Sequence, residues 1–167
     1  MLVFQILLLI ALVINIFHTY LHWRECTGRS ELLSHKYVSP MVSLGWVAWA
    51  AMLFTDPSRV LFGLLRIPAL IVGIAGIVLV YLGHRDVPFE DSGKLVTTGV
   101  FAYIRHPIYY GSILCLVGFP IAVGSLHTLY ASLLLATLNL YWRHIEEKNL
   151  AKRFGNAYLN YKKRVKL

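Results

Sequence analysis

Long apolar runs alternate with short polar segments along this chain of 167 residues. The first run, from Leu2 to Leu21, has about the length of a helix that crosses a hydrocarbon core of roughly 30 Å. After the polar segment 22–39, a second run extends from Pro40 to about Phe54, and proline suits the first turn of a helix. A third run extends from Val60 to Leu82. We predict that the second and third spans form a hairpin around the tight turn 55–58.

The segment 83–106 is rich in charged residues, glycine and proline, and we interpret it as an aqueous loop because such a segment does not lie against lipid. The apolar run that follows, from Ile108 to Trp142, is too short for two full spans, yet Pro120, Gly124 and Ser125 interrupt its middle. Each half reaches about 20 to 25 Å at ~1.5 Å per residue. We predict a short helical hairpin, and one long span is the alternative.

Charged residues continue in helical register beyond Trp142, so the last helix of this hairpin is expected to run on into water and to end near Gly155. A final short amphipathic helix, from Asn156 to Val165, places Tyr158 and Tyr161 on one face and basic residues on the other. The predicted fold is therefore an all-α integral membrane protein with about five transmembrane helices and a helical C-terminal region.

Composition and charge agree with a membrane protein and orient it. Hydrophobic residues make up 57% of the chain and charged residues 14%, and the net charge of +8 comes largely from the tail 152–166. Cytoplasmic segments carry the excess of Lys and Arg, so we predict an N-terminus outside and a cytoplasmic C-terminus and active site. The apolar body argues against a nucleic-acid partner, and anionic membrane lipids are the expected neighbours of the tail.

A few polar residues interrupt the predicted spans. Asn15, His18 and His22 share one helix face, and we interpret them as packing contacts to other helices, with a substrate contact as the alternative. No third ligand is placed by spacing, so no metal site is predicted. Arg66 is costly within a span, and we expect it to pair with a carboxylate or to reach a head group.

The most informative residues lie where the aqueous loop enters the fourth span. In a structural interpretation, Pro107 begins a helix, Arg105 extends to lipid head groups and His106 caps the helix. In a functional interpretation, the free amides of that helix bind the carboxylate of an amino-acid-like cofactor together with Arg105 and His106. Three aromatic side chains near this point are candidates for stacking on an adenine: Phe101, Tyr103 and Tyr109.

A second polar cluster, 143–148, follows the fifth span. In a structural interpretation, this cluster is a solvated helix face on which Arg143 and Glu147 pair at i,i+4, and such a pair adds little to the stability of the helix. Its position favours a function, because the hairpin brings Glu146 and Glu147 to the same side of the membrane as His106. A carboxylate there faces the positive sulfonium of a methyl donor.

The ordered combination of these motifs resembles the isoprenylcysteine carboxyl methyltransferases and their bacterial and archaeal relatives and, more distantly, the phospholipid methyltransferases. The motifs are Leu-Val-Thr-Thr-Gly over 95–99, Arg-His-Pro-x-Tyr-x-Gly over 105–111, Glu-Glu at 146–147 and Phe-Gly-x-x-Tyr-x-x-Tyr over 154–161. The resemblance implies one membrane domain over 1–167, in which 1–83 shape a lipid-facing cavity and 84–167 bind S-adenosylmethionine.

The resemblance also implies roles for individual residues. Glu146 lies at the substrate end and, with Arg143 and Arg105, forms the expected catalytic set, although Trp142 occupies the place where the family often has an arginine. The expected S-adenosylmethionine site comprises Gly93, Lys94, Leu95, Val96, Phe101, Tyr103, His106, Pro107, Ile108, Tyr109 and Glu147.

The expected reaction methylates the carboxylate of a lipophilic, isoprenylcysteine-like acceptor and releases S-adenosylhomocysteine. Three alternatives remain open: a phospholipid amine N-methyltransferase, a membrane reductase that uses NADPH, and a non-enzymatic membrane scaffold.

Overall fold

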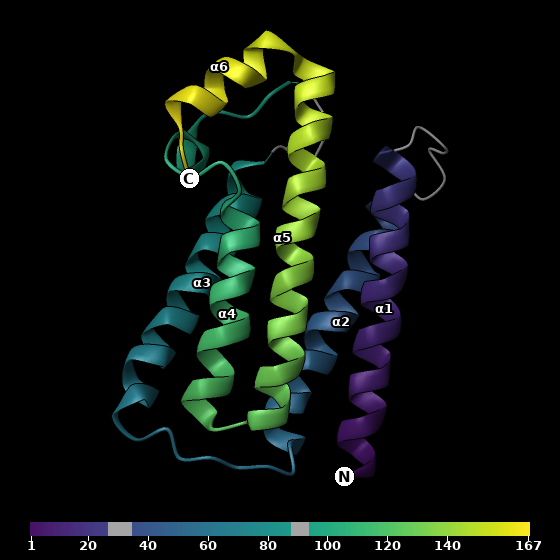
Figure 1. The fold of residues 1–167 in the computed structure, drawn as a ribbon, viewed down its shortest axis with the longest axis vertical. Coiled ribbons are helices and arrows are strands. Elements are labelled where there is room, and N and C mark those ends of the chain that lie inside the picture. Colours follow the sequence, from purple (N-terminus) through teal and green to yellow (C-terminus); the bar gives the residue numbers. More distant parts are fainter. Residues whose placement is uncertain (27–34, 88–93) are drawn as a thin grey trace.

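The computed structural model describes residues 1–26, 35–87 and 94–167, and these residues form helices and connecting segments without a strand (Figure 1). The all-α prediction is therefore confirmed. The elements in chain order are α1 (Leu2–Cys26), α2 (His35–Thr55), the 3-10 helix η1 (Gly63–Leu65), α3 (Arg66–Asp86), the 3-10 helix η2 (Gly99–Ala102), α4 (Pro107–Val123), α5 (Leu126–Phe154) and α6 (Asn156–Arg164).

The long helices run side by side and define two ends of the molecule. The upper end in Figure 1 holds the start of α4, the end of α5 and the crossing helix α6. The lower end holds the segment between α2 and η1 and the turn between α4 and α5. Two helical segments are apolar and long enough to cross a membrane, Leu2–Leu21 and Gly63–Asp86, and two shorter apolar ones are Pro40–Thr55 and Pro107–Val123. The number of crossings stays a prediction.

The predicted hairpin of the second and third spans is wrong, because α3 packs along α4 rather than α2. Small residues bring the two backbones together. A Cβ built on Gly76 lies 2.6 Å from the carbonyl oxygen of Gly111, and one built on Gly118 lies 2.5 Å from the amide nitrogen of Gly73. Any side chain at these positions pushes the helices apart, and such close approach is how small residues stabilise helix pairs in membranes. Close contact between these glycine-containing faces, which we call the α3–α4 seam, therefore decides that α3 pairs with α4 and not with its neighbour in the sequence, α2.

The predicted short hairpin of 108–142 is confirmed. Gly124 ends α4 in the left-handed conformation, with φ of 79°, and its amide donates to the carbonyl of Pro120. At 17 residues, α4 is about 25 Å long. The continuation of α5 past Trp142 to Phe154, its end at Gly155 and the final helix α6 are also as predicted.

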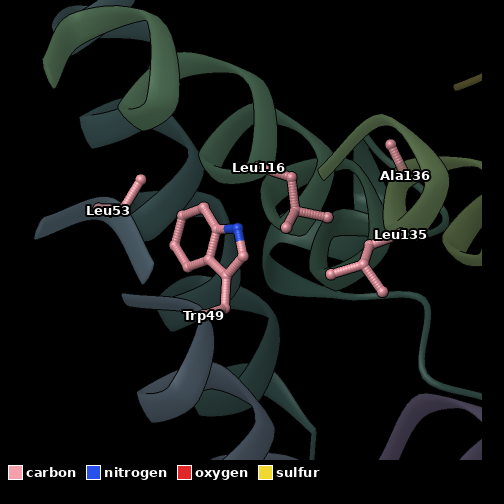
Figure 2. Close-up of a cluster of buried hydrophobic side chains, with 5 residues drawn as sticks. All are labelled: Trp49, Leu53, Leu116, Leu135 and Ala136. Carbon is pink, nitrogen blue, oxygen red and sulfur yellow. The ribbon is translucent and has the colours of Figure 1, made fainter. Parts of the chain in front are cut away.

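A buried cluster fixes α2 against this hairpin (Figure 2). Trp49 and Leu53 of α2 pack against Leu116 of α4 and against Leu135 and Ala136 of α5. The indole of Trp49 also donates a hydrogen bond of 2.8 Å to the hydroxyl of Ser132, so its polar atom is satisfied inside the cluster. This contact holds the α4–α5 hairpin at a fixed height relative to α2.

Helix α1 joins the bundle through α2 and α5. His18 lies edge-on against Trp142 of α5 with ring centroids 4.7 Å apart, and the Trp142 indole donates to the Thr19 hydroxyl at 3.0 Å. The packing interpretation of His18 is therefore confirmed. Asn15 donates to the carbonyl of Ala11 in its own helix, and the side chain of His22 lies outside the described part of the chain.

The lower end is closed by hydrogen bonds around the buried carboxylate of Asp56. It accepts from the amide of Thr128 at 2.8 Å, the hydroxyl of Thr128 at 3.0 Å, the amide and hydroxyl of Ser58 at 2.9 Å each and the ring of His127 at 3.1 Å. Because Thr128 lies in the first turn of α5, the carboxylate also faces the positive end of that helix. We call this set the Asp56 cluster.

Two arginines complete the lower end. Arg59 donates to the carbonyls of Leu53 and Phe54 at 2.8 Å each, at the C-terminal end of α2. The third span, predicted from Val60, begins as the helix α3 only at Arg66. Arg66 was expected to find a carboxylate or a head group. It donates instead to the carbonyl of Ala122 at 2.8 Å, near the negative C-terminal end of α4.

Candidate functional site

The loop that leads into α4 is anchored before it reaches the site. The carboxylate of Asp86, the last residue of α3, accepts the amide of Val100 at 2.7 Å. Proline at the first position of α4 then begins the helix, as predicted for Pro107. His106 occupies the cap position, yet its side chain makes no capping hydrogen bond, and the Arg105 side chain is only 8% exposed. The interpretation in which Arg105 extends to head groups and His106 caps the helix is therefore wrong.

Charged side chains from α5, α6 and the loop before α4 meet at the upper end. Arg105 Nη2 lies 3.0 Å from Glu147 Oε1, and Lys162 Nζ of α6 lies 2.7 Å from Glu147 Oε2. His106 Nε2 lies 3.3 Å from Glu147 Oε1, and its Nδ1 lies 3.6 Å from Glu146 Oε2. The prediction that the hairpin brings the two motifs together is confirmed. We call these five residues the Glu147 cluster.

Glu147 is the electrostatic centre of this cluster. Burial on its own raises the pKa of the carboxyl, but the hydrogen bonds from Lys162 and Arg105 and their positive charges outweigh it, and the pKa falls to about 2. The carboxylate therefore stays ionised at any physiological pH. Nearby, burial and then the negative charge of Glu147 raise the pKa of the Tyr158 phenol to about 12, so that its hydroxyl keeps its proton.

Several buried polar atoms around the cluster have no hydrogen-bond partner. Within the described residues these atoms are Arg105 Nε, His106 Nε2, Arg143 Nε and the Tyr158 hydroxyl. The distance of His106 Nε2 from Glu147 suits an ion pair, but the geometry is not that of a hydrogen bond. Buried polar groups are normally bonded, because leaving one unpaired costs about 1–3 kcal/mol. Four such atoms in one region are available to bond to a polar ligand.

Arg143 lies one helical turn before Glu147 and faces α4. Its Nη1 donates to the hydroxyl of Tyr110 at 2.6 Å, and its guanidinium carbon lies 5.7 Å from the centre of that ring. The i,i+4 pair of Arg143 with Glu147, considered from the sequence, is replaced by these contacts and by those of Glu147 to Arg105 and Lys162. Arg143 thus extends the polar region from the Glu147 cluster toward the apolar part of the hairpin.

The loop residues predicted to line a cofactor site have different environments. Leu95 packs against the buried cluster of α6, and the carbonyl of Phe101 accepts the hydroxyl of Tyr161 at 2.6 Å. Val96 is half-buried, whereas Lys94 and Tyr103 are exposed, Tyr103 to 79%. Gly93 lies outside the described residues.

The residues at the start of α4 are held more firmly. Pro107 is fully buried, and it and Ile108 pack against Gly83 of α3. The ring of Tyr109 is half-buried with its centre 6.0 Å from that of His106. The structure therefore gathers His106, Tyr109 and the carboxylates, and it leaves Tyr103 apart.

Sequence reasoning missed Lys162, Tyr158 and Tyr110 as members of this region. The basic tail was expected to face head groups, and only the turn at Gly155, with φ of 52°, brings Lys162 back to a carboxylate fifteen residues earlier. The available signal was the pair of tyrosines on one face of α6. Both are buried, and their burial holds α6 across the loop.

A small cavity adjoins the cluster between α5 and α6. It has a volume of about 160 Å³ and is lined by His144, Glu147, Lys148, Ala151, Tyr158, Leu159 and Lys162. Cavities that enclose drug-sized ligands measure about 300–1,000 Å³. The described residues contain no group of three His, Cys, Asp or Glu side chains suited to a metal ion.

Comparisons with known proteins agree with the motifs at this site. The profile of the phospholipid methyltransferase family matches residues 59–157, which include all of α4 and α5. The protein-S-isoprenylcysteine O-methyltransferase of Schizosaccharomyces pombe is 38% identical over 77 residues. This match covers 42% of the present chain and 30% of the length of that relative. No solved structure matches the chain significantly.

Proposed function

The chain belongs to the phospholipid methyltransferase family, and on that premise we propose that it is a membrane enzyme that transfers a methyl group from S-adenosylmethionine to a lipophilic acceptor. The observation that carries the proposal is the set of three buried, unpaired nitrogens around the Glu147 cluster, those of Arg105, His106 and Arg143. A cluster formed only for stability has no reason to leave them unpaired.

The residues present fit the amino-acid part of such a cofactor. Arg105 Nε is an unpaired donor, and His106 Nε2 is one when it carries a proton, so both suit a carboxylate. The Glu146 side chain is 40% exposed and suits a positive group. When bound, S-adenosylmethionine supplies an electrophilic methyl group on a positive sulfonium. Glu147 keeps Arg105 and Lys162 in place, and α6 covers the site against water.

The acceptor is proposed to be a carboxylate on a lipid-like molecule. The activity for which the relative from Schizosaccharomyces pombe is named, isoprenylcysteine O-methylation, supports this choice. Arg143 adds a specific observation, because its unpaired Nε and its charge attract a carboxylate and repel an ammonium group. A carboxylate is already a nucleophile at neutral pH, so no dedicated base is needed. A phospholipid amine, suggested by the family name, is the second candidate.

The first test is calorimetric titration of the detergent-purified chain with S-adenosylhomocysteine and, separately, with NADPH. We expect binding of S-adenosylhomocysteine and a loss of affinity of about tenfold or more in His106→Ala, which corresponds to ~1.4 kcal/mol. His84→Ala is the matched control, because His84 is exposed and bonds only to the carbonyl of Val80 in its own helix.

Preference for NADPH identifies a reductase, and binding of neither ligand identifies a scaffold. Either result removes the proposed function. Equal loss of affinity in both histidine variants removes the assignment of the site.

A further inference from the structure

The cavity between α5 and α6 has features that the proposed methyl transfer does not use. Its walls carry the exposed bases His144 and Lys148 of α5 and Lys162 of α6, beside the apolar side chains of Ala151 and Leu159 and the ring of Tyr158. Its volume of about 160 Å³ suits a small group rather than a nucleoside, since enclosed ligands of that size need roughly 300 Å³ or more.

The charge of this cavity is positive. Its one carboxylate, Glu147, is already bonded to Arg105 and to Lys162. Lys148 therefore adds a cation that the cluster does not compensate, and His144 adds a ring that is able to donate. The Tyr158 hydroxyl, in a residue only 1% exposed, has no hydrogen-bond partner. Ammonium, imidazole and phenol groups are all donors, and a phosphate offers acceptors to each.

The height of the cavity along α5 points to the source of that phosphate. His144 and Ala151 lie two and nine residues beyond Trp142, where the apolar stretch of α5 ends, and these separations correspond to about 3 and 13 Å along the helix. The headgroup layer on each side of a bilayer is roughly 5 to 8 Å thick. With the hydrocarbon core ending at Trp142, as predicted from the sequence, the cavity begins at the depth at which lipid phosphates lie.

We propose that this cavity binds the phosphate of a membrane phospholipid headgroup that is not the methyl acceptor. The lipid phosphate accepts hydrogen bonds from Lys148, His144 and the Tyr158 hydroxyl, and its acyl chains lie along the outer face of α5. Because Lys162 and Glu147 border both the cavity and the Glu147 cluster, a bound lipid braces α6 over the site.

The test uses the full chain in detergent and short-chain phosphatidylglycerol, which carries neither an amine nor a carboxylate to be methylated. Binding is measured by native mass spectrometry, with short-chain diacylglycerol as the matched lipid without phosphate and inorganic phosphate as the free anion. We expect phosphatidylglycerol to bind, diacylglycerol not to bind, and inorganic phosphate to bind at least about tenfold more weakly than the lipid.

The variant His144→Gln with Lys148→Gln is expected to weaken phosphatidylglycerol binding about tenfold or more. Both residues are exposed, so the fold is not at risk, and Lys152→Gln, on the same helix outside the cavity, is the matched control. Tyr158→Phe removes only the unpaired hydroxyl and should weaken binding as well. Unchanged binding in these variants, or equal binding of diacylglycerol, overturns the proposal, and equally tight inorganic phosphate overturns the lipid source.

Saturating S-adenosylhomocysteine separates this inference from the proposed function. If it displaces phosphatidylglycerol, and the double variant loses both ligands, the cavity belongs to the cofactor site and the proposal fails. If the chain binds phosphatidylglycerol but no S-adenosylhomocysteine, the proposed function fails and the lipid site stands.

Discussion

The two ends of the bundle each hold a carboxylate at the centre of a polar cluster, but they differ in how completely the surrounding polar atoms are satisfied. Asp56 at the lower end accepts hydrogen bonds from Ser58, His127 and Thr128, and within the described residues no buried side-chain atom of this cluster is unpaired. At the upper end, both carboxylate oxygens of Glu147 are paired, one with Arg105 and one with Lys162, yet buried nitrogens of Arg105 and His106 beside them have no partner. Full pairing is typical of a structural cluster, and incomplete pairing indicates a ligand site.

The largest effect should come from Glu146 at the upper end. Glu146→Gln is expected to reduce methyl transfer by about 10²–10³-fold, the usual cost of removing one preorganised electrostatic group. The unfolding temperature should hardly change, because the side chain is 40% exposed and lies 3.6 Å from His106. Transfer of labelled methyl to a small prenylcysteine, together with a thermal melt, measures both. A large fall in unfolding temperature with full activity would make the upper end structural as well.

For Asp56→Ala at the lower end we expect the opposite result, a loss of stability without a loss of ligand affinity. The substitution leaves the buried Thr128 amide without its acceptor and removes one of the two acceptors of the Thr128 hydroxyl, and we expect a loss of about 3 kcal/mol in the free energy of unfolding. The affinity for S-adenosylhomocysteine should stay the same, since the mutated residue lies at the opposite end of the bundle. Thermal melts on the variant test the predicted loss of stability, and calorimetry on the same preparation tests the unchanged affinity. Lost affinity in folded protein would show that the ends are coupled.

Acid should weaken both ends in the same range of pH. The pKa values of the Asp56 and Glu147 carboxyls are each lowered to about 2, from ordinary values of 3.8 and 4.5. For Asp56, burial opposes the shift, and hydrogen bonds from Thr128, Ser58 and His127 outweigh it. A lowered folded pKa gives stability that is complete above the unfolded value and is lost as the pH falls toward the folded value.

The unfolding temperature should therefore be constant between about pH 7 and 5 and fall between about pH 4.5 and 2. Asp56→Asn should reduce that fall in unfolding temperature. Lys162→Met should also reduce it, by the part of the lowered pKa of Glu147 that Lys162 causes. Melts across this range test the assignment. An equally steep fall in both variants would place the acid-sensitive groups elsewhere.

The sequence predicted the parts of this comparison that depend on neighbouring residues. Residues that interrupt the apolar run predicted the turn at Gly124 and the end of α5 at Gly155. The resulting hairpin then predicted that His106 meets the carboxylates of α5. The α3–α4 seam was missed because glycines of two separate helices become a pattern only when the helices face each other. The Asp56 cluster was missed for the same reason, since Thr128 lies 72 residues from Asp56.

The smallest expected effect concerns Tyr110, which marks the inner edge of the upper cluster. Tyr110→Phe removes only the hydroxyl that accepts from Arg143 at 2.6 Å, and one hydrogen bond contributes about 1 kcal/mol. If Arg143 orients the acceptor carboxylate, this change should raise the KM for a prenylcysteine about fivefold. The affinity for S-adenosylhomocysteine and the unfolding temperature should stay nearly unchanged.

Tyr109→Phe is the matched control for Tyr110→Phe, because it removes the hydroxyl of the neighbouring tyrosine, whose ring centre lies 6.0 Å from that of His106. An equal rise in KM in both variants would show that the aromatic region as a whole positions the acceptor. A change confined to cofactor affinity in Tyr110→Phe would move Arg143 from the acceptor side of the site to the cofactor side. The ligand region would then end at Arg143, and Glu146 could not replace it on the acceptor side, because two carboxylates repel each other.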